Sequence, residues 1–232
     1  QIDDYAHKAA AVVEAFLPAL QAPALAAQLY GRTNRWGKLP VTYYSGKLPW
    51  NLTDMAVSTG VGRTYRYYSG TPLYEFGHGL SYTNFSLSCT NTSTARWTSC
   101  ETTHLGQGAR TVSTYTCDVK NLGDMDGDEV VFLYHRPTDS LAARAAHKQT
   151  LSLSGGGSSG WSLPKKALVD WQRVHVPAGK KVTVPFAVDA EMLALRGQAG
   201  ATIKTLHRGE HTIEFSRGHG ETQRMTIDVA CQ

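Results

Sequence analysis

Nineteen acidic residues and nine histidines are the side chains of this sequence that could perform acid–base chemistry. Two carboxyl groups held close together would fit the hydrolysis of a glycosidic bond, in which one is the acid and the other the nucleophile or base. Glu14 and Glu75 are the acids set among apolar or aromatic neighbours, but no spacing brings them together. Four histidines in polar, loop-like contexts are expected to be solvated, namely His104, His147, His207 and His219. The sequence therefore predicts no catalytic residue in this chain.

The acidic run DMDGDE, residues 124–129, is a candidate metal-binding loop. Its three aspartates match the first three ligand positions of a calcium-binding EF-hand, but its glycine is misplaced and the twelfth position is His135 rather than Glu. We interpret the run as a turn between two strands that its acids keep soluble. The sequence also has no phosphate-binding loop, no GxSxG elbow, no HExxH motif and no GxGxxG opening a helix. It therefore predicts neither a metal nor an organic cofactor.

Four cysteines, Cys89, Cys100, Cys117 and Cys231, are the other reactive side chains. Their spacing lacks the CxxC pairs of a zinc site, so we expect two disulfides. Four cysteines allow three connectivities, and the sequence does not choose among them. We favour Cys89–Cys100, which would close a short surface loop, together with Cys117–Cys231, which would join two strands.

Three Asn-x-Ser/Thr sequons are candidate glycosylation sites, at Asn51, Asn84 and Asn91. Sequons close together in a chain that also carries disulfide candidates favour a secretory history. The sequence starts at Gln1, without Met and without a signal segment, which we interpret as a processed piece of something longer. We therefore expect a secreted protein or one of a secretory compartment.

Composition excludes several other classes of protein. Hydrophobic residues make up 41% and charged residues 18% of the 232 residues, as expected of a folded protein with a sizeable core. The net charge of +4 is spread along the chain, which argues against nucleic acid as a partner. No apolar run approaches the roughly 20 residues needed to span a bilayer, so we expect no membrane span.

The type of secondary structure expected along the chain changes twice. Residues 1–45 read as α/β, with a helix over 22–31 that ends at Gly31 and a strand within 38–44. Because this segment is too short to be a domain, we interpret it as the C-terminal end of an α/β sandwich domain whose other strands lie elsewhere. Residues 46–82 read as an extended linker rich in aromatic residues and glycine.

From residue 83 the hydrophobic pattern has a period of two, which is typical of strands. The seven strand candidates are residues 85–89, 111–121, 128–136, 167–176, 181–188, 210–218 and 223–232. Seven short strands in residues 83–232 predict a mainly β fold, an antiparallel sandwich with fibronectin type III or immunoglobulin topology. Residues 189–195 read as a short helix, and the Gly/Ser-rich residues 151–164 as a surface loop.

The run GRTYRYYSGTPLYEFGHGLSYTNFSL, residues 62–87, strongly resembles the segment that joins the second and third domains of glycoside hydrolase family 3. Residues 72–85 match every defined position of that family's Pro-Leu-Tyr-x-Phe-Gly-x-Gly-Leu-Ser-Tyr-Thr-x-Phe string. Residues 30–44 look like the final strand of its α/β sandwich domain, and residues 127–135 and 164–186 look like strands of its fibronectin type III-like domain. LTDMAV followed by GRTYRYY is closer to the β-xylosidase branch than to most β-glucosidases.

The resemblance implies a role and a missing partner. In that family the nucleophilic aspartate lies in an N-terminal TIM barrel and the acid/base glutamate usually lies upstream in the α/β domain, and neither motif has a matching position here. It therefore implies the C-terminal chain of a retaining, β-xylosidase-like exo-glycosidase that is inactive alone. The partner would be an N-terminal chain that carries the barrel and most of the α/β domain, and through it the oligosaccharide substrate. One departure is LPALQAPAL, residues 17–25, which lacks the glycines of the family's Pro-Gly-x-x-Gly-Gly loop.

A non-catalytic carbohydrate-binding or adhesion module is the alternative interpretation. Trp97 and Trp161 lie in loop-like contexts, where their rings could stack on a sugar, whereas Trp171 lies in a strand pattern and is expected in the core. The aromatic rings of the linker could likewise form a sugar platform. The family resemblance favours instead a linker whose rings cement neighbouring domains.

Overall fold

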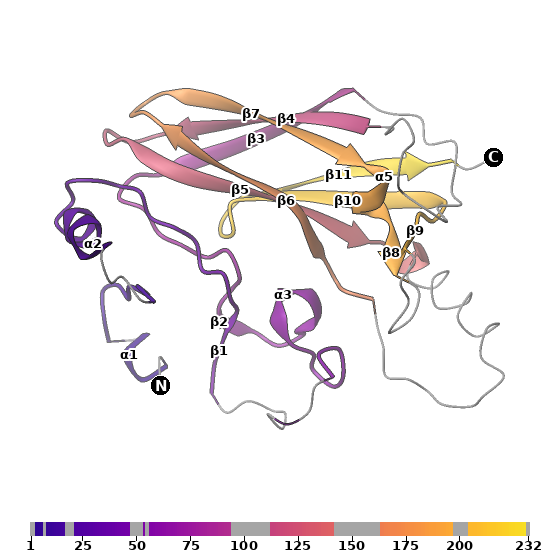
Figure 1. Cartoon of the computed structure of the whole chain (residues 1–232), viewed down its shortest axis with the longest axis horizontal. Coiled ribbons are helices and arrows are strands. Elements are labelled where there is room, and N and C mark those ends of the chain that lie inside the picture. The colour runs from indigo at the N-terminus through magenta and orange to yellow at the C-terminus, as the bar shows by residue number, and fades with distance from the viewer. Residues whose placement is uncertain are drawn as a thin grey trace.

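The computed structural model describes residues 3–6, 8–16, 21–46, 53, 56–93, 112–141, 163–196 and 204–230. A β-sandwich forms most of this part of the chain, and the N-terminal segments lie along one side of the sandwich (Figure 1). Within these residues, no helix is long and apolar enough to cross a bilayer. The fold is mainly β, as the sequence predicts.

The N-terminal segments contain short elements: α1 (Asp3–Ala6), α2 (Ala22–Leu29), β1 (Tyr43–Tyr44), α3 (Thr64–Tyr67) and β2 (Pro72–Tyr74). Helix α2 ends where the sequence predicts, because Gly31 has a φ of +68° and so takes the left-handed conformation that closes a helix. The strand expected within 38–44 is shortened to β1, which pairs with β2 through Tyr43 and Tyr74. This two-stranded ribbon is all that the described N-terminal residues contribute to a sheet.

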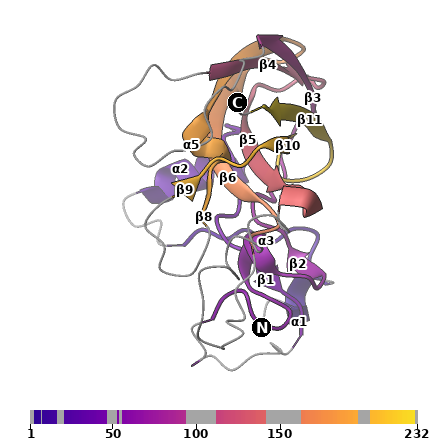
Figure 2. The ribbon, with the colours of Figure 1, turned by 90° about the vertical axis from the view of Figure 1, so that its right-hand side faces the viewer.

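The sandwich consists of two antiparallel sheets that contain all seven predicted strands. One sheet has the order β3-β4-β7, with β3 (Phe85–Ser93), β4 (Val112–Asn121) and β7 (Lys181–Asp189). The other has the order β11-β10-β5-β6, with β5 (Gly127–Pro137), β6 (Ala167–Val176), β10 (Gly209–Ser216) and β11 (Thr222–Val229). The short elements between β7 and β10 are α5 (Ala190–Leu193), β8 (Leu195–Arg196) and β9 (Lys204–Thr205). Figure 2 shows the two sheets from the side.

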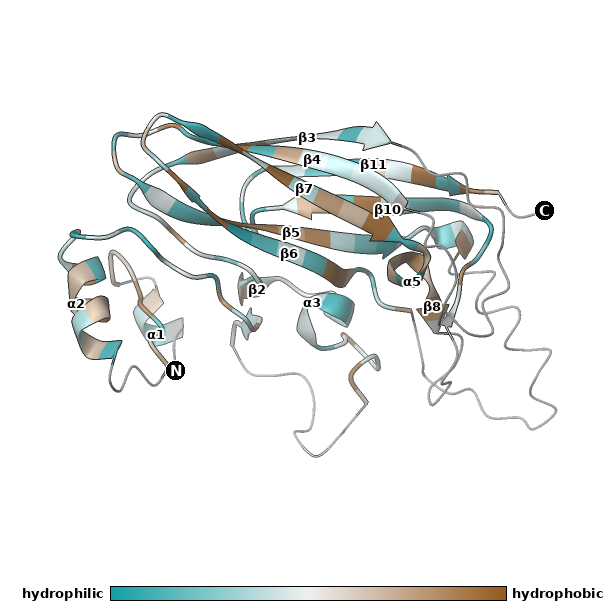
Figure 3. Ribbon diagram, turned by 45° about the horizontal axis from the view of Figure 1, so that its top comes forward, coloured by the Kyte–Doolittle hydropathy of each residue, from teal (hydrophilic) through white to brown (hydrophobic). Residues whose placement is uncertain are grey.

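The core lies between the sheets because each strand turns alternate side chains inward. In β7, Val184, Phe186 and Val188 are buried while the residues between them are exposed. Their neighbours include Tyr115 and Phe215, whose ring centroids lie 5.6 Å apart. Figure 3 shows brown, hydrophobic segments along β5 and β7. Each such side chain contributes about 1.5–3 kcal/mol when fully buried.

Strand β5 differs from the other strands because both of its faces are covered. Val131 and Leu133 point into the sandwich core, whereas Val130, Phe132 and Tyr134 form a second cluster on the outer face of the sheet. The run DEVVFLYHR therefore needs a cover outside the sandwich. The predicted linker provides that cover.

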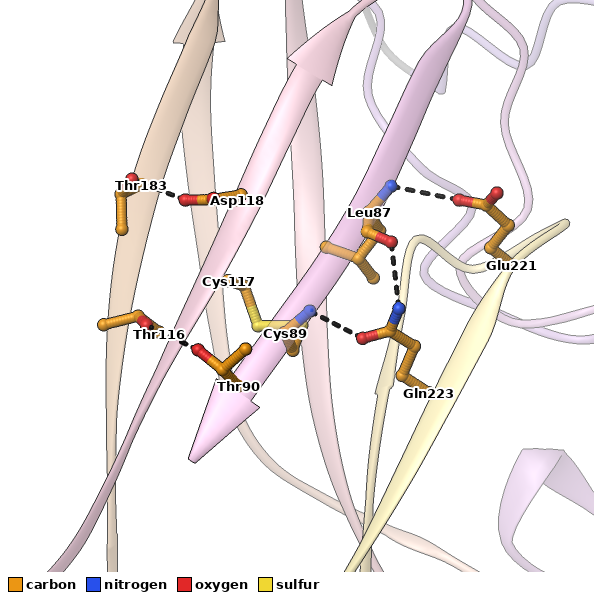
Figure 4. The surroundings of a disulfide bond; sticks show 9 residues. All are labelled: Leu87, Cys89, Thr90, Thr116, Cys117, Asp118, Thr183, Glu221 and Gln223. Atoms are coloured by element: carbon orange, nitrogen blue, oxygen red, sulfur yellow. Dashed lines mark hydrogen bonds between the residues drawn. A yellow bond between two sulfur atoms is a disulfide. The ribbon is translucent and has the colours of Figure 1, made fainter. Parts of the chain in front are cut away.

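The structure corrects the disulfide pairing. Cys89 bonds to Cys117, which lies directly opposite on the neighbouring strand, with 4.0 Å between the Cα atoms. The favoured Cys89–Cys100 and Cys117–Cys231 pairs are therefore wrong, because the register of β3 and β4 decides the partner and the sequence does not reveal it. Cys100 and Cys231 lie outside the described residues. Figure 4 shows the bond between the neighbouring strands β3 and β4, with the Gln223 side-chain amide hydrogen-bonded to the backbone of β3.

Replacing both Cys89 and Cys117 by alanine should lower the free energy of unfolding by about 3–4 kcal/mol, since the bond closes a loop of 28 residues in the unfolded chain. Urea unfolding of the variant and of the parent chain measures this loss. The variant Thr90→Ala is a control, since it removes only an exposed hydroxyl contact with Thr116 beside the bond. A double variant as stable as the parent chain would contradict the assigned bond.

Candidate functional site

The linker lies against the outer face of the β11-β10-β5-β6 sheet, and we call its described residues 56–82 the arm. Three hydrogen bonds join the arm to β6 and to the segment that leads into it. Lys165 N donates to Arg66 O over 2.7 Å, and Lys165 Nζ donates to Tyr68 O over 2.8 Å. Leu168 N donates to Tyr65 Oη over 3.2 Å. The arm is thus held by backbone as well as by side chains.

The rings of the arm pack against the rings of β5. Tyr65 stacks on Phe76 with 4.5 Å between ring centroids, and Phe76 lies 5.8 Å from Phe132. Tyr65 also lies 5.8 Å from Tyr134, whose exposed fraction is 1%. Tyr134 and Phe132 are buried and Tyr65 and Phe76 are partly buried, so the contact between these rings removes a large apolar area from water. These rings therefore hold the arm against the sandwich by hydrophobic packing.

Two Gly-His-Gly turns meet where the arm crosses the end of β10. Gly77 in the arm and Gly218 after β10 have φ angles of +84° and +85°, which glycine adopts readily. A Cβ on Gly218 would collide with the Gly77 carbonyl, and one on Gly77 would lie 2.9 Å from the Phe132 ring. The rings of His78 and His219 lie 5.4 Å apart. Only glycine allows the two turns to approach this closely.

A buried ion triad lies beside these turns. Glu129 of β5 accepts from Lys38 Nζ at 2.8 Å and from Arg217 Nη1 at 2.9 Å. The three side chains are 2%, 8% and 10% exposed, in the order Glu129, Lys38 and Arg217. Burial lowers the pKa of Lys38, while its attraction to Glu129 opposes that shift. The triad joins three parts of the chain, because Lys38 lies upstream of β1 and Arg217 follows β10.

The two histidines of the Gly-His-Gly turns border the triad. Burial, then the charges of Lys38 and Arg217, lower the pKa of His219 to about 4. Burial and then Lys38 also lower the pKa of His78, which Glu75 partly offsets. Both histidines are therefore neutral at pH 7, and protonating either would add a positive charge near Lys38. Their neutral state keeps a further positive charge away from the triad.

A second histidine pair lies in the described core. His135 Nε2 lies 3.1 Å from His211 Nδ1, and His211 Nε2 lies 2.7 Å from the carbonyl oxygen of His207. Because His211 Nε2 must donate to that carbonyl, its Nδ1 accepts and His135 Nε2 donates. Burial, followed by the charge of His211, lowers the pKa of His135 to about 3. Burial also lowers the pKa of His211.

We expect the free energy of unfolding to fall as the pH drops from about 6.5 to about 3. Over this range His135 takes up a proton in the unfolded chain but not in the folded one, so stability is lost as pH falls. The slope for one such histidine approaches about 1.4 kcal/mol per pH unit. Urea unfolding at several pH values measures it, and the slope should decrease in the variant His135→Gln. An unchanged slope would contradict the neutral, buried pair.

Both buried carboxylates of the described residues are held by cations. Glu129 belongs to the triad, and Glu214 binds Arg136 and Lys166 at 3.2 Å and Arg224 at 2.8 Å. The hydrogen bonds and charges of these partners lower the pKa of Glu214, although burial raises it. Both carboxylates therefore serve as anchors of buried ion clusters that hold strands and loops together.

The acidic residues that the sequence analysis considered as candidates lie outside these buried ion clusters, except for Glu129. Glu14 is exposed and accepts from the Tyr43 hydroxyl over 3.1 Å, and Glu75 is exposed in the arm. The acidic run 124–129 begins in the turn between β4 and β5 and continues into β5, where Asp128 binds Arg173. No cluster of three or more metal-ligating side chains occurs in the described part of the chain.

The predicted modification and binding residues fall into two groups. Asn84 and Asn91 are exposed, on the linker side of β3 and on β3 itself, so their glycosylation stays a prediction. The other candidates lie outside the described residues, namely Asn51, Trp97, Trp161, Cys100 and Cys231, and with them His104 and His147.

Three expectations for single side chains are wrong. Trp171 is 57% exposed rather than in the core, because β6 is an edge strand and Trp171 lies on its outer face. His207 is 8% exposed, and His219 is partly buried under the arm, so neither is a solvated loop residue. Polar neighbours in the sequence indicate a loop, but they do not show whether another segment of the chain covers that loop.

The sequence pattern did not predict the triad. Its available signal was Glu129, an acid that opens the apolar run EVVFLY and must be paired if that run is buried. The partners could not be read from the sequence because Lys38 and Arg217 are far from Glu129 along the chain.

The family resemblance is confirmed by comparison with known proteins. Residues 1–82 match the "Glycosyl hydrolase family 3 C-terminal domain". Beta-D-xylosidase 1 of Arabidopsis thaliana is 30% identical over 83% of this chain and 26% of its own length. An exo-1,4-beta-xylosidase of Emericella nidulans is 34% identical over 83% of this chain and 23% of its own length. The chain thus spans about a quarter of the length of these curated relatives.

Solved structures agree on the fold. A β-glucosidase from Erythrobacter marinus has a TM-score of 0.61 and 26% identity, over 89% of this chain and 23% of that one. A β-glucosidase from Kluyveromyces marxianus has a TM-score of 0.62 and 23% identity, over 89% of this chain and 22% of that one. The similarity extends over both the N-terminal segments and the sandwich.

Proposed function

Because this chain belongs to glycosyl hydrolase family 3 and matches its C-terminal domain, we propose that it is the C-terminal portion of a retaining exo-glycosidase. The curated relatives with 30% and 34% identity are named as β-xylosidases, which favours terminal β-linked xylose of oligosaccharides as the substrate. The neighbouring solved structures are titled as β-glucosidases, so β-glucosides are the second substrate to test.

The catalytic carboxylates belong to an N-terminal part of the parent protein in this proposal. Support comes from the buried acids of the described residues, Glu129 and Glu214, which are both neutralised by cations. A retaining mechanism needs a nucleophile and an acid/base about 5–5.5 Å apart, in a site that a sugar can enter. Acids buried in ion clusters do not supply such a site.

This chain contributes structure to the parent enzyme. Residues 1–45 would complete the α/β domain, residues 46–82 would join it to the sandwich, and residues 83–232 would form the sandwich. The observation that carries the proposal is the junction of ring cluster, interlocked glycine turns and ion triad, which fixes the end of the α/β segment to the sandwich. Tyr65 and Phe76 of the arm pack against rings of β5, which favours a structural role of the arm over the alternative of a sugar-binding module.

Secretion, glycosylation and the retaining mechanism are parts of the same proposal. The exposed side chains of Asn84 and Asn91 are compatible with glycans, and the Cys89–Cys117 bond is compatible with an oxidising compartment.

Native mass spectrometry of the purified protein, followed by denatured masses and assays on aryl β-xyloside and β-glucoside, tests the proposal. We expect this chain to be part of, or bound to, a polypeptide large enough for a barrel and an α/β domain, with activity only in that species. A chain that occurs alone and hydrolyses either glycoside would contradict the assignment. So would a full-size species that hydrolyses neither.

A further inference from the structure

The ion triad carries an excess of one positive charge. Lys38 and Arg217 both pair with Glu129, which is the one carboxylate that either cation contacts in the part of the chain that the structure describes. Glu75, an acid of the nearby arm, is exposed. Because the side chains of the two cations are only 8% and 10% exposed, water screens the excess charge poorly. A buried charge of this kind is unfavourable unless another ion balances it.

Two nitrogens beside the triad are buried and have no hydrogen-bond partner among the described residues. They are Nε of Arg217 and Nδ1 of His219, two residues apart in the turn that follows β10. Arg217 uses Nη1 on Glu129 over 2.9 Å. An arginine nitrogen can only donate, so Nε needs an acceptor of its own. Buried donors are rarely left unpaired in folded proteins, and the acceptor for Nε must therefore come from outside the described residues.

We propose that the junction of arm and sandwich binds one small monovalent anion, for which chloride is the natural choice, through Nε of Arg217. A single negative charge balances the excess charge of the triad. A sulfate or phosphate dianion would overcompensate that charge, and a water molecule would leave it unbalanced. The neutral ring of His219 supplies a second donor when its proton is on Nδ1. The residues of the site all belong to this chain, so the inference does not rest on the proposed function.

The packing around the triad favours an ion of atomic size over a larger anionic ligand. The backbone of Gly218 lies so close to Gly77 that a Cβ on Gly218 would collide with the Gly77 carbonyl. On the Lys38 side, a Cβ on Gly79 would lie 2.8 Å from the carbonyl oxygen of Gly37. A site between such closely packed segments suits a halide better than a sugar acid or the carboxylate of a peptide.

The electrostatic surroundings of His219 agree with an anion site. Burial, followed by the charges of Lys38 and Arg217, lowers the pKa of this histidine to about 4, although Glu129 partly offsets the shift. The two cations thus act on the ring more strongly than the carboxylate does. A positive potential in a buried place is what attracts a negative ion from solution.

Crystals of the full parent protein grown with sodium bromide test the inference directly, because bromide replaces chloride and is located by its anomalous scattering. We expect a bromide peak within hydrogen-bond distance of Arg217 Nε. A water molecule at that position, or a carboxylate of the N-terminal part, would overturn the inference. Bromide that appears there only at molar concentration would show an adventitious ion only, and would also overturn it.

Hydrogen exchange of the full parent protein in solution supplies a second readout. Sodium gluconate replaces sodium chloride at fixed ionic strength, so that only the identity of the anion changes. Amides of residues 56–82 and 209–221 that exchange through opening of the junction should slow about ten-fold for each ten-fold rise in chloride above its dissociation constant. Exchange rates that do not change with chloride would contradict the inference.

Two arginine variants assign the chloride effect to the site. Arg217→Lys keeps a cation for Glu129 but removes the Nε donor, so the chloride dependence of exchange should disappear. Arg224→Lys is the matched control, since Arg224 Nε already donates to Glu214 over 2.8 Å, and it should keep the full dependence. Equal chloride dependence in both variants would overturn the assignment to Arg217. If Arg217→Lys does not fold, the bromide position in the parent protein decides.

Discussion

Replacing Glu129 by glutamine should lower the free energy of unfolding by about 3–5 kcal/mol, the cost of removing one partner from a buried ion cluster. The substitution keeps the shape of the side chain but leaves Lys38 and Arg217, which are 8% and 10% exposed, without a counter-charge. Desolvation of an unpaired cation is not repaid by an amide oxygen. Urea unfolding followed by circular dichroism measures the loss.

The matched control for this prediction is Asp118→Asn. Asp118 forms an ion pair of similar length, 2.7 Å to Lys181 Nζ, but on the surface, where Lys181 is 56% exposed. Exposed pairs contribute up to about 1 kcal/mol, so this variant should stay close to the parent chain. Equal losses in the two variants would show that burial of the triad does not govern its strength.

Replacing Gly218 by alanine should separate the arm from the sandwich. The residue has a φ of +85°, which costs a non-glycine residue about 1–2 kcal/mol, and its new Cβ would also collide with the Gly77 backbone. Because backbone cannot move aside as a flexible side chain can, the turn or the arm must shift. We expect faster proteolysis within residues 56–82 and a total loss of stability clearly above the cost of backbone strain alone.

Gly179→Ala is the matched control, since Gly179 has a φ of +65° but no atom within 4 Å of the position that a Cβ would take. Its loss of stability should be limited to the strain of the left-handed conformation, and the arm should stay protected. If the two variants behave alike, the interlocked turns do not hold the arm.

The strands of the sandwich could be predicted because their signal is local. Alternation in residues such as those of β7 fixes which side chains point inward, and turn-forming runs mark the ends. The arm could be predicted as a connector because the string over residues 72–85 is long and specific. Its structural role could also be inferred, because a segment with so many aromatic rings needs a second surface that buries them.

Features that depend on register or on distant segments could not be predicted. The partner of Cys89 is decided by the register of β3 and β4, which places Cys117 directly opposite. In the sequence Cys100 is closer to Cys89 than Cys117 is, so spacing alone favours the wrong partner. Trp171 has the same alternating context as core residues, and its exposure follows from the edge position of β6. The partners of Glu129 come from segments that the fold alone brings together.

Whether this chain has a structural rather than a catalytic role can be decided by treating the full parent protein with an activated 2-deoxy-2-fluoro-β-xyloside and mapping the label by mass spectrometry. Retaining enzymes form a covalent glycosyl intermediate on their nucleophilic carboxylate, and the fluorine slows its hydrolysis. We expect one label, on an aspartate of the N-terminal part, and none on the residues of this chain. A label on any acid of this chain would contradict its structural role.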